Sequence, residues 1–167
     1  MGDGLGDFGR RGALALGLAT VLAACTSPSE SSDETTVRTD SEPLERRFAA
    51  LGRLSDAHWL GMVLGTDSRG SVPGPTDVRV VGFARLRAGG VKAVTGAPRE
   101  GFSPTAPSPP PEPLVPYLPK GAHWVRSESF DREVTGGAYA GTFFLDESED
   151  LVYFDTTNPL PAPSSGH

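Results

Sequence analysis

The chain has 167 residues, a formal net charge of −6 and 37% hydrophobic residues. This length allows one ordinary domain. The negative charge argues against a nucleic-acid partner, because phosphates require a basic protein surface. The single cysteine excludes an intrachain disulfide and any multi-cysteine metal site, so stability must come from the burial of apolar surface.

An uncharged and largely apolar run occupies residues 12–24, directly after Arg10 and Arg11. A membrane-spanning helix needs about 20 apolar residues, so this run is too short to be one. Its length and its basic flank match the hydrophobic region of a secretory signal peptide. We therefore predict that residues 1–24 form an export signal.

The apolar run ends in Leu22-Ala23-Ala24-Cys25, which resembles the lipobox of bacterial lipoproteins. The resemblance covers about the first 25 residues. It implies that a peptidase cuts before Cys25 and that the sulfur carries a diacylglyceryl group, with fatty acids such as palmitate. Two acyl chains hold a protein on a membrane where one gives only reversible binding. The expected location is the extracytoplasmic face of the plasma membrane; a buried free cysteine is the alternative.

The export route is left open by the sequence. Arg10-Arg11 also resembles a twin-arginine export signal. However, residues 12–14 are a poor match to the apolar pair expected after the arginines. Two arginines also occur in the basic region of general secretory signals. Both routes place the body outside the cytoplasm.

Residues 26–42 are rich in serine and threonine and hold five acids against one arginine. Such a segment cannot bury enough surface to offset its ordering entropy, and its acids repel one another. The chain is therefore predicted to divide into a signal peptide 1–24, a lipidated Cys25 with a flexible acidic tether 25–42, a globular domain 43–160 and a disordered tail 161–167.

Alternating helix and strand signals follow in the first half of the domain. In 43–52, apolar residues at i, i+4 and i+7 between a proline and a glycine predict a short helix. Residues 57–64 are apolar on both faces, which favours a central strand. A turn-rich loop 65–75 precedes a half-buried strand at 78–86. A helix over 87–94 is weakened by Gly89-Gly90.

The segment 98–119 holds nine prolines in 22 residues. Proline cannot donate a backbone hydrogen bond, so the segment cannot join a sheet interior and is predicted to be an extended loop without regular secondary structure. Its overlapping P-x-x-P spacings also suit a recognition segment. A surface spacer is the alternative. Trp124 and Val125 can end a short strand.

Ser127 is a good N-cap for a helix that carries Phe130 and Val134 on one face and ends at Gly136. Strands 139–145 and 151–156 then form a hairpin through the acidic turn 146–150. We predict an α+β fold: a small, mostly antiparallel sheet of four to five strands, two or three short helices and a long Pro-rich loop.

The body also resembles uncharacterised small lipoproteins of high-GC Gram-positive bacteria. The similar features are the His58-Trp59 strand, the 72–77 turn and the hairpin that runs from Gly141 to Phe154-Asp155. The resemblance implies a shared fold and carries no activity.

The predicted interaction surface consists of the 65–75 loop, with Asp67 and Arg69, and of His58 and Trp59 at the sheet rim. Long loops on a rigid scaffold often bind partners. Asp67 and Arg69 offer charged hydrogen bonds, and tryptophan is enriched at binding hot spots. The alternative for Trp59 is a core position.

No strong catalytic, metal or cofactor motif is found. Ser68 with His58 is the one candidate hydrolase pair, but the loop lacks the first glycine of a nucleophile elbow. A histidine bonded within the core is the alternative for His58 and His123. The acidic turn lacks the glycine and final glutamate of an EF-hand and is expected to be solvated. We therefore expect a non-enzymatic envelope domain that binds an envelope protein, wall polymer or small ligand; the alternative is an envelope hydrolase.

Overall fold

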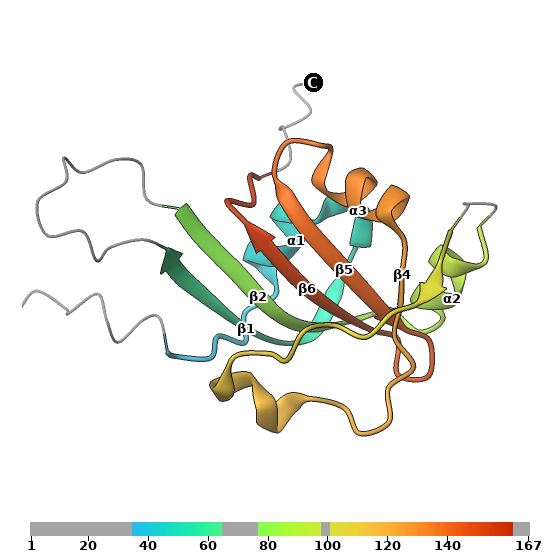
Figure 1. The fold of residues 1–167 in the computed structure, drawn as a ribbon, viewed down its shortest axis with the longest axis horizontal. Helices are drawn as coiled ribbons and strands as arrows, with labels where there is room; N and C mark the ends of the chain where they lie inside the picture. Colours follow the sequence, from blue (N-terminus) through green and yellow to red (C-terminus); the bar gives the residue numbers. More distant parts are fainter. Residues whose placement is uncertain (1–34, 65–76, 98–100, 162–167) are drawn as a thin grey trace, which may run out of the picture.

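Figure 1 shows the computed structural model, which describes residues 35–64, 77–97 and 101–161. The described part is an α+β fold built on one antiparallel sheet in the order β1-β2-β6-β5-β4-β3. Its strands are β1 (Leu54–Leu64), β2 (Asp77–Leu86), β3 (Ser103–Pro104), β4 (Val125–Arg126), β5 (Ala140–Asp146) and β6 (Leu151–Thr157). Its helices are α1 (Glu42–Arg47), α2 (Gly90–Thr95) and α3 (Glu128–Thr135), with 3₁₀ helices η2 (Ala49–Leu51) and η3 (Glu112–Tyr117).

The antiparallel α+β class is confirmed, and the strand number is six instead of the four to five predicted. The difference comes from the two-residue strands β3 and β4, which are too short to leave a periodic signal in the sequence. Strand β3 lies inside the Pro-rich segment at the edge of the sheet, where proline is tolerated because an edge needs hydrogen bonds on one side only.

Local signals located α3 and the last hairpin correctly. The Ser127 Oγ accepts a hydrogen bond from the Phe130 N–H at 3.4 Å, and Gly136 ends α3 with φ of 60°. Strands β5 and β6 pair from Asp146 with Leu151, as the acidic turn predicted. Helix α2 also forms, because the Asp150 carboxylate accepts hydrogen bonds from backbone N–H groups of its first turn.

Strand β1 lies at the edge of the sheet, so its prediction as a central strand was wrong. The free edge of β1 is nevertheless partly paired, because the chain before α1 runs along it. Arg38 pairs with Trp59 through two backbone hydrogen bonds of 2.8 and 2.9 Å, and the Trp59 indole N–H donates to the Asp40 carbonyl. Ordered packing therefore begins before residue 43, where the domain boundary was predicted.

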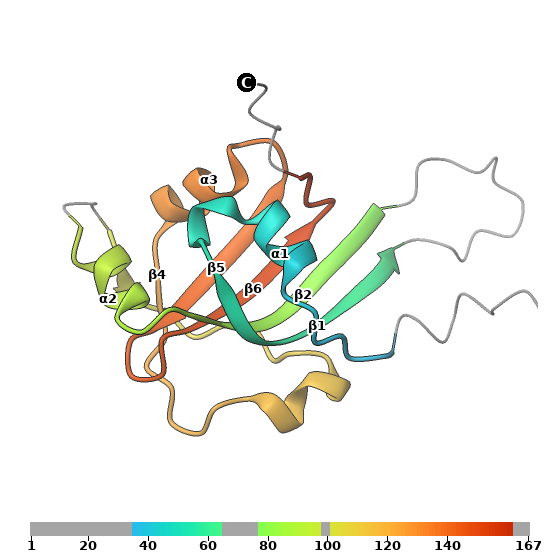
Figure 2. The same cartoon turned by 180° about the vertical axis from the view of Figure 1, so that it is seen from behind.

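Helices cover the first face of the sheet (Figure 2). Their buried residues join those of the strands in a cluster that includes Phe48, Trp59, Phe130, Phe143 and Phe154. Gly82 faces Trp59 across β1 and β2, and a Cβ atom there would lie 2.4 Å from the His58 carbonyl oxygen and 2.5 Å from the Trp59 Cβ. Trp59 can therefore pack in this cluster only because residue 82 is a glycine.

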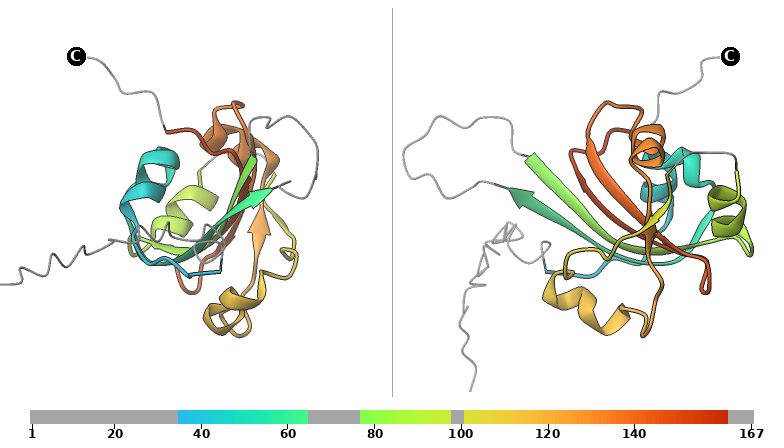
Figure 3. Two further views of the ribbon diagram at one scale, coloured as in Figure 1. Left: turned by 90° about the vertical axis from the view of Figure 1, so that its left-hand side faces the viewer. Right: turned by 45° about the vertical axis from the view of Figure 1, so that its right-hand side comes forward.

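The Pro-rich segment covers the second face, on the side of the sheet opposite α1 (Figure 3). Its η3 inserts Leu114, which is fully buried, against Leu60, Val81, Phe83 and Tyr153. The prediction of an extended loop without regular secondary structure was therefore wrong. Proline excludes the segment from the sheet interior but allows a short 3₁₀ helix whose single large apolar side chain is buried.

We predict that Gly82→Ala destabilises the fold, because the added methyl group overlaps the backbone of β1. Overpacking of this kind costs about 1–3 kcal/mol in the free energy of unfolding, which urea denaturation would measure. Gly61→Ala on β1 is the matched control, since a Cβ there meets only the Trp59 ring at 3.7 Å. Equal stability of the two variants would contradict this account of Trp59 packing.

Candidate functional site

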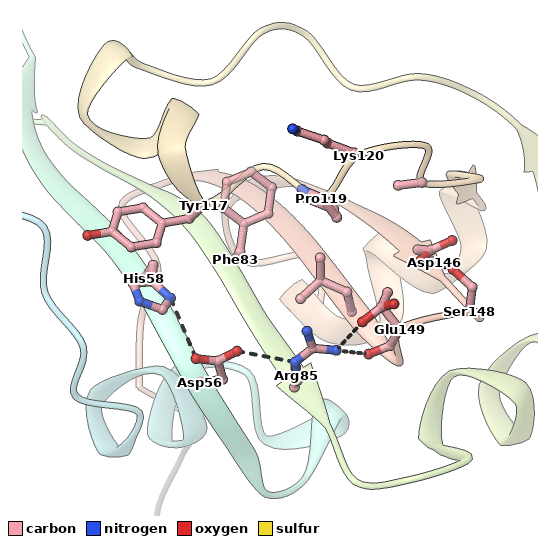
Figure 4. Close-up of a pocket in the computed structure, with 12 residues that line it drawn as sticks. Asp56, His58, Phe83, Arg85, Tyr117, Pro119, Lys120, Asp146, Ser148 and Glu149 are labelled. Atoms are coloured by element: carbon pink, nitrogen blue, oxygen red, sulfur yellow. Dashed lines mark hydrogen bonds and ion pairs between the residues drawn. The ribbon is translucent and has the colours of Figure 1, made fainter.

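A cavity of about 340 Å³ lies between the second face of the sheet and the chain that follows η3 (Figure 4). Residues from β1, β2, the 117–122 stretch and the β5–β6 turn surround it. Its polar lining is Asp56, His58, Arg85, Lys120, Asp146, Ser148 and Glu149, and its apolar lining is Phe83, Tyr117, Pro119, Ala122 and Leu151.

A bulge in β1 gives the cavity its first acid. Leu54 and Trp59 both enter the first-face cluster, although residues five apart point to opposite faces of a regular strand. The register accordingly shifts between Ser55 and His58, and Asp56 has a φ of 46°. Such bulges redirect side chains beside functional sites. Here the Asp56 carboxylate is directed toward Arg85 and His58.

Arg85 connects two acids across the floor of the cavity. Its Nε donates to Asp56 Oδ2 at 3.2 Å, and its Nη1 donates to Glu149 Oε2 at 3.0 Å and to the Glu149 carbonyl oxygen. These bonds, that of Glu149 foremost, raise the pKa of the Arg85 guanidinium. Because the pairs are partly exposed, they add little to stability. Their main effect is to hold three polar groups in fixed positions.

Tyr117 closes the cavity over His58. The two rings stack with centroids 4.0 Å apart and an angle of 22° between their planes. On its other side, His58 Nδ1 lies 4.0 Å from Asp56 Oδ1, an ion pair when the imidazole is protonated. Lys120 follows on the same wall and makes no ion pair or hydrogen bond with the described part of the chain. Its ammonium group remains available to a bound molecule.

The far end of the cavity is formed by the β5–β6 turn. Asp146 is fully buried and accepts hydrogen bonds from the His123 backbone N–H at 2.9 Å and from the Ser148 Oγ at 2.6 Å. The carboxylates of Asp146 and of Asp150, which caps α2, therefore hold neighbouring segments of the fold in place. The expectation of a solvated acidic turn was therefore wrong for these two residues.

The structure separates the residues of the predicted interaction surface. His58 lines the cavity, whereas Trp59 is 4% exposed in the first-face cluster, in line with the core alternative. Asp67, Arg69 and Ser68 lie outside the described residues. Ser148 is the serine that lines this cavity, and Figure 4 shows it at the opposite end from His58, so the two do not form a nucleophile–base pair.

Five polar or aromatic residues of this site were not predicted from the sequence: Asp56, Arg85, Tyr117, Lys120 and Glu149. Asp56 lay outside the predicted strand, Arg85 was assigned to the polar face of its strand and Glu149 to a solvated turn. Tyr117 and Lys120 were assigned to a loop or its end. The available signal was Arg85 itself, a charged residue in a strand that is otherwise almost wholly apolar over 80–86.

No protein-family model, curated protein or solved structure matches this chain. Among the described helices, none has the length and apolar character needed to cross a membrane.

Tyr153 lies beneath the cavity floor, with its ring 4.9 Å from that of Phe83. It is 1% exposed, and its hydroxyl group has no hydrogen-bond partner among the residues that the structure describes. Burial raises the pKa of Tyr153 to about 12, and the negative charge of Asp155 adds to the effect. The phenol therefore stays neutral in the folded state up to a pH at which an exposed tyrosine is ionised.

We predict that Tyr153→Phe leaves the free energy of unfolding at pH 7 unchanged or raises it, since an unpaired buried hydroxyl is removed. Between pH 10 and 12 the unfolded state loses the Tyr153 proton and the folded state keeps it, so the wild type loses stability by on the order of 2 kcal/mol from this group. Urea denaturation from pH 9 to 11.5 should show a shallower decline in the variant. An identical decline of stability in the wild type and the variant would contradict the raised pKa of Tyr153.

Proposed function

We propose that this protein is a lipoprotein of the extracytoplasmic face of the plasma membrane, anchored through Cys25, whose body binds a small polar ligand in the cavity beside Arg85. The observation that carries the binding role is the cavity itself. It brings seven polar and five apolar side chains together in one hollow of about 340 Å³, and small molecules bind in such concave sites where polar groups converge.

The charges of the cavity favour a ligand without a large net charge. Arg85 is neutralised by Asp56 and Glu149, and the Asp146 carboxylate is occupied by two donors. Recognition then depends on hydrogen bonds from the paired groups and from Lys120, which has no partner among the described residues. Phe83 and Leu151 can pack against C–H groups of the ligand. A neutral saccharide, such as one unit of a wall polymer, has both kinds of surface.

The anchoring is carried by the Leu22–Cys25 pattern and tested at its sulfur. Cys25→Ser removes the thiol that takes the diacylglyceryl group, so the variant should leave the membrane fraction or accumulate at precursor size. Fractionation followed by immunoblotting measures both. Recovery of Cys25→Ser in the membrane fraction at the same mature size as the wild type would refute lipid anchoring.

The binding role is tested by Arg85→Gln, which keeps hydrogen-bonding atoms but removes the charge that holds Asp56 and Glu149. We expect affinity for N-acetylated amino sugars and their short oligomers to fall at least tenfold, which corresponds to about 1.4 kcal/mol. Titration calorimetry with the full chain measures the affinity.

The matched control is Arg79→Gln. Arg79 lies on the same strand and face and is paired with Asp155 at 2.7 and 2.8 Å, but it does not line the cavity. Its loss should leave binding unchanged. Equal losses in the two variants, or no saccharide binding by the wild type, would overturn the saccharide site.

A further inference from the structure

Four consecutive apolar residues of the Pro-rich segment face the solvent: Val115, Pro116, Tyr117 and Leu118. Val115 is 52%, Tyr117 44% and Leu118 39% exposed. We call these four residues the η3 apolar run. Uninterrupted exposed runs of this kind oppose solubility and are expected only where they have a function.

The fold itself does not require this run. Leu114 alone provides the buried contact of η3 with the second-face cluster, and it is fully buried. Val115 lies within η3, Leu118 is the residue at which η3 ends, and the side chains of both are exposed. Polar residues at these two positions would keep the Leu114 contact and the Tyr117–His58 stack.

The N-terminal segment joins the body on the same face. Val37 packs against the second-face cluster that contains Leu114, one residue before Arg38 pairs with β1. The chain thus enters the domain beside η3. Figure 3 shows the start of the described chain and η3 on the same side of the sheet in the right-hand view.

The link between Cys25 and the body is short. Nine residues lie between Cys25 and Thr35, where the described chain begins, and the ten residue steps reach at most about 35 Å when fully extended. A domain of this size has a diameter of roughly 35 Å. A lipid on Cys25 therefore keeps the body within about one domain diameter of the bilayer, and the tether joins the body on the side of the sheet that carries η3.

We propose that the η3 apolar run is a membrane-contacting surface that rests in the interfacial layer of the bilayer in which Cys25 is anchored; this inference depends on the proposed anchoring. Tyrosine suits that layer, since its ring is apolar and its hydroxyl group stays hydrated. Lys120, unpaired within the described residues and two positions beyond the run, can reach lipid phosphates.

The experiment places a tryptophan on the run and detects its depth in the bilayer. Leu118→Trp protein is purified as the full expressed chain and reconstituted into phosphatidylcholine–phosphatidylglycerol vesicles with brominated acyl chains, which quench tryptophan fluorescence at short range. Emission of the added residue should fall by about half if it enters the headgroup–acyl boundary, which lies about 5–10 Å deep. The wild type provides the background of Trp59 and Trp124.

Leu160→Trp is the matched control. Leu160 is 55% exposed and belongs to the segment that follows β6, which lies on the opposite side of the molecule from η3 (Figure 1). Its emission should be unquenched in the same vesicles. Equal quenching at 118 and 160, or none at 118, would overturn the membrane contact. So would a dimer in the wild type that light scattering shows to be lost in Val115→Ser/Leu118→Ser, because the run would then be a self-contact.

Mass spectrometry of the same preparations separates this inference from the anchoring. Two or more acyl chains on Cys25 with no quenching at 118 would refute the surface and keep the anchor. If Cys25 carries no lipid, the proposed anchor fails. Its free thiol can then be coupled to a maleimide phospholipid, and quenching at 118 still decides whether the η3 apolar run contacts the bilayer.

Discussion

Both faces of the sheet are apolar, and the helices cover only one of them. The second face carries Leu60, Val81, Phe83 and Tyr153, so some other part of the chain has to exclude water from it. The Pro-rich segment does so, and over its described positions 101–119 Leu114 is the one fully buried residue. This single insertion holds η3 in place and positions the chain that follows it, from Tyr117 to Ala122, as one wall of the cavity.

The polar half of the site depends on a different constraint, which is the alternation of side chains between the two faces of β1. Leu54 and Trp59 can both be buried on the first face only if the strand contains one extra residue. That residue is accommodated by a bulge at Asp56 with positive φ. The strain is modest, since aspartate tolerates this region better than most residues. Its consequence is a carboxylate held between His58 and Arg85, so core packing on one face determines the geometry of the cavity on the other.

Sequence signals were sufficient where structure is local. Ser127 and Gly136 bound α3, and the acidic turn sets the β5–β6 register, because these effects act within a few residues. The order of strands and the cavity could not be inferred in this way. Asp56, Arg85, Tyr117 and Glu149 come from four distant segments that only the completed sheet brings together. Likewise, composition showed that 98–119 avoids the sheet interior but not that Leu114 closes its second face.

The proposed ligand site and the proposed membrane contact share η3. Tyr117 belongs to both, because its ring stacks on His58 within the cavity while its outer edge lies in the η3 apolar run. In a protein anchored at Cys25, the bilayer would then support the element that forms one wall of the cavity. Contact with the membrane would restrict the motion of η3 and lower the entropy lost when a ligand orders that wall. A cavity wall attached to the sheet mainly by Leu114 gains most from such support, which gives a physical reason for apolar residues on its solvent side.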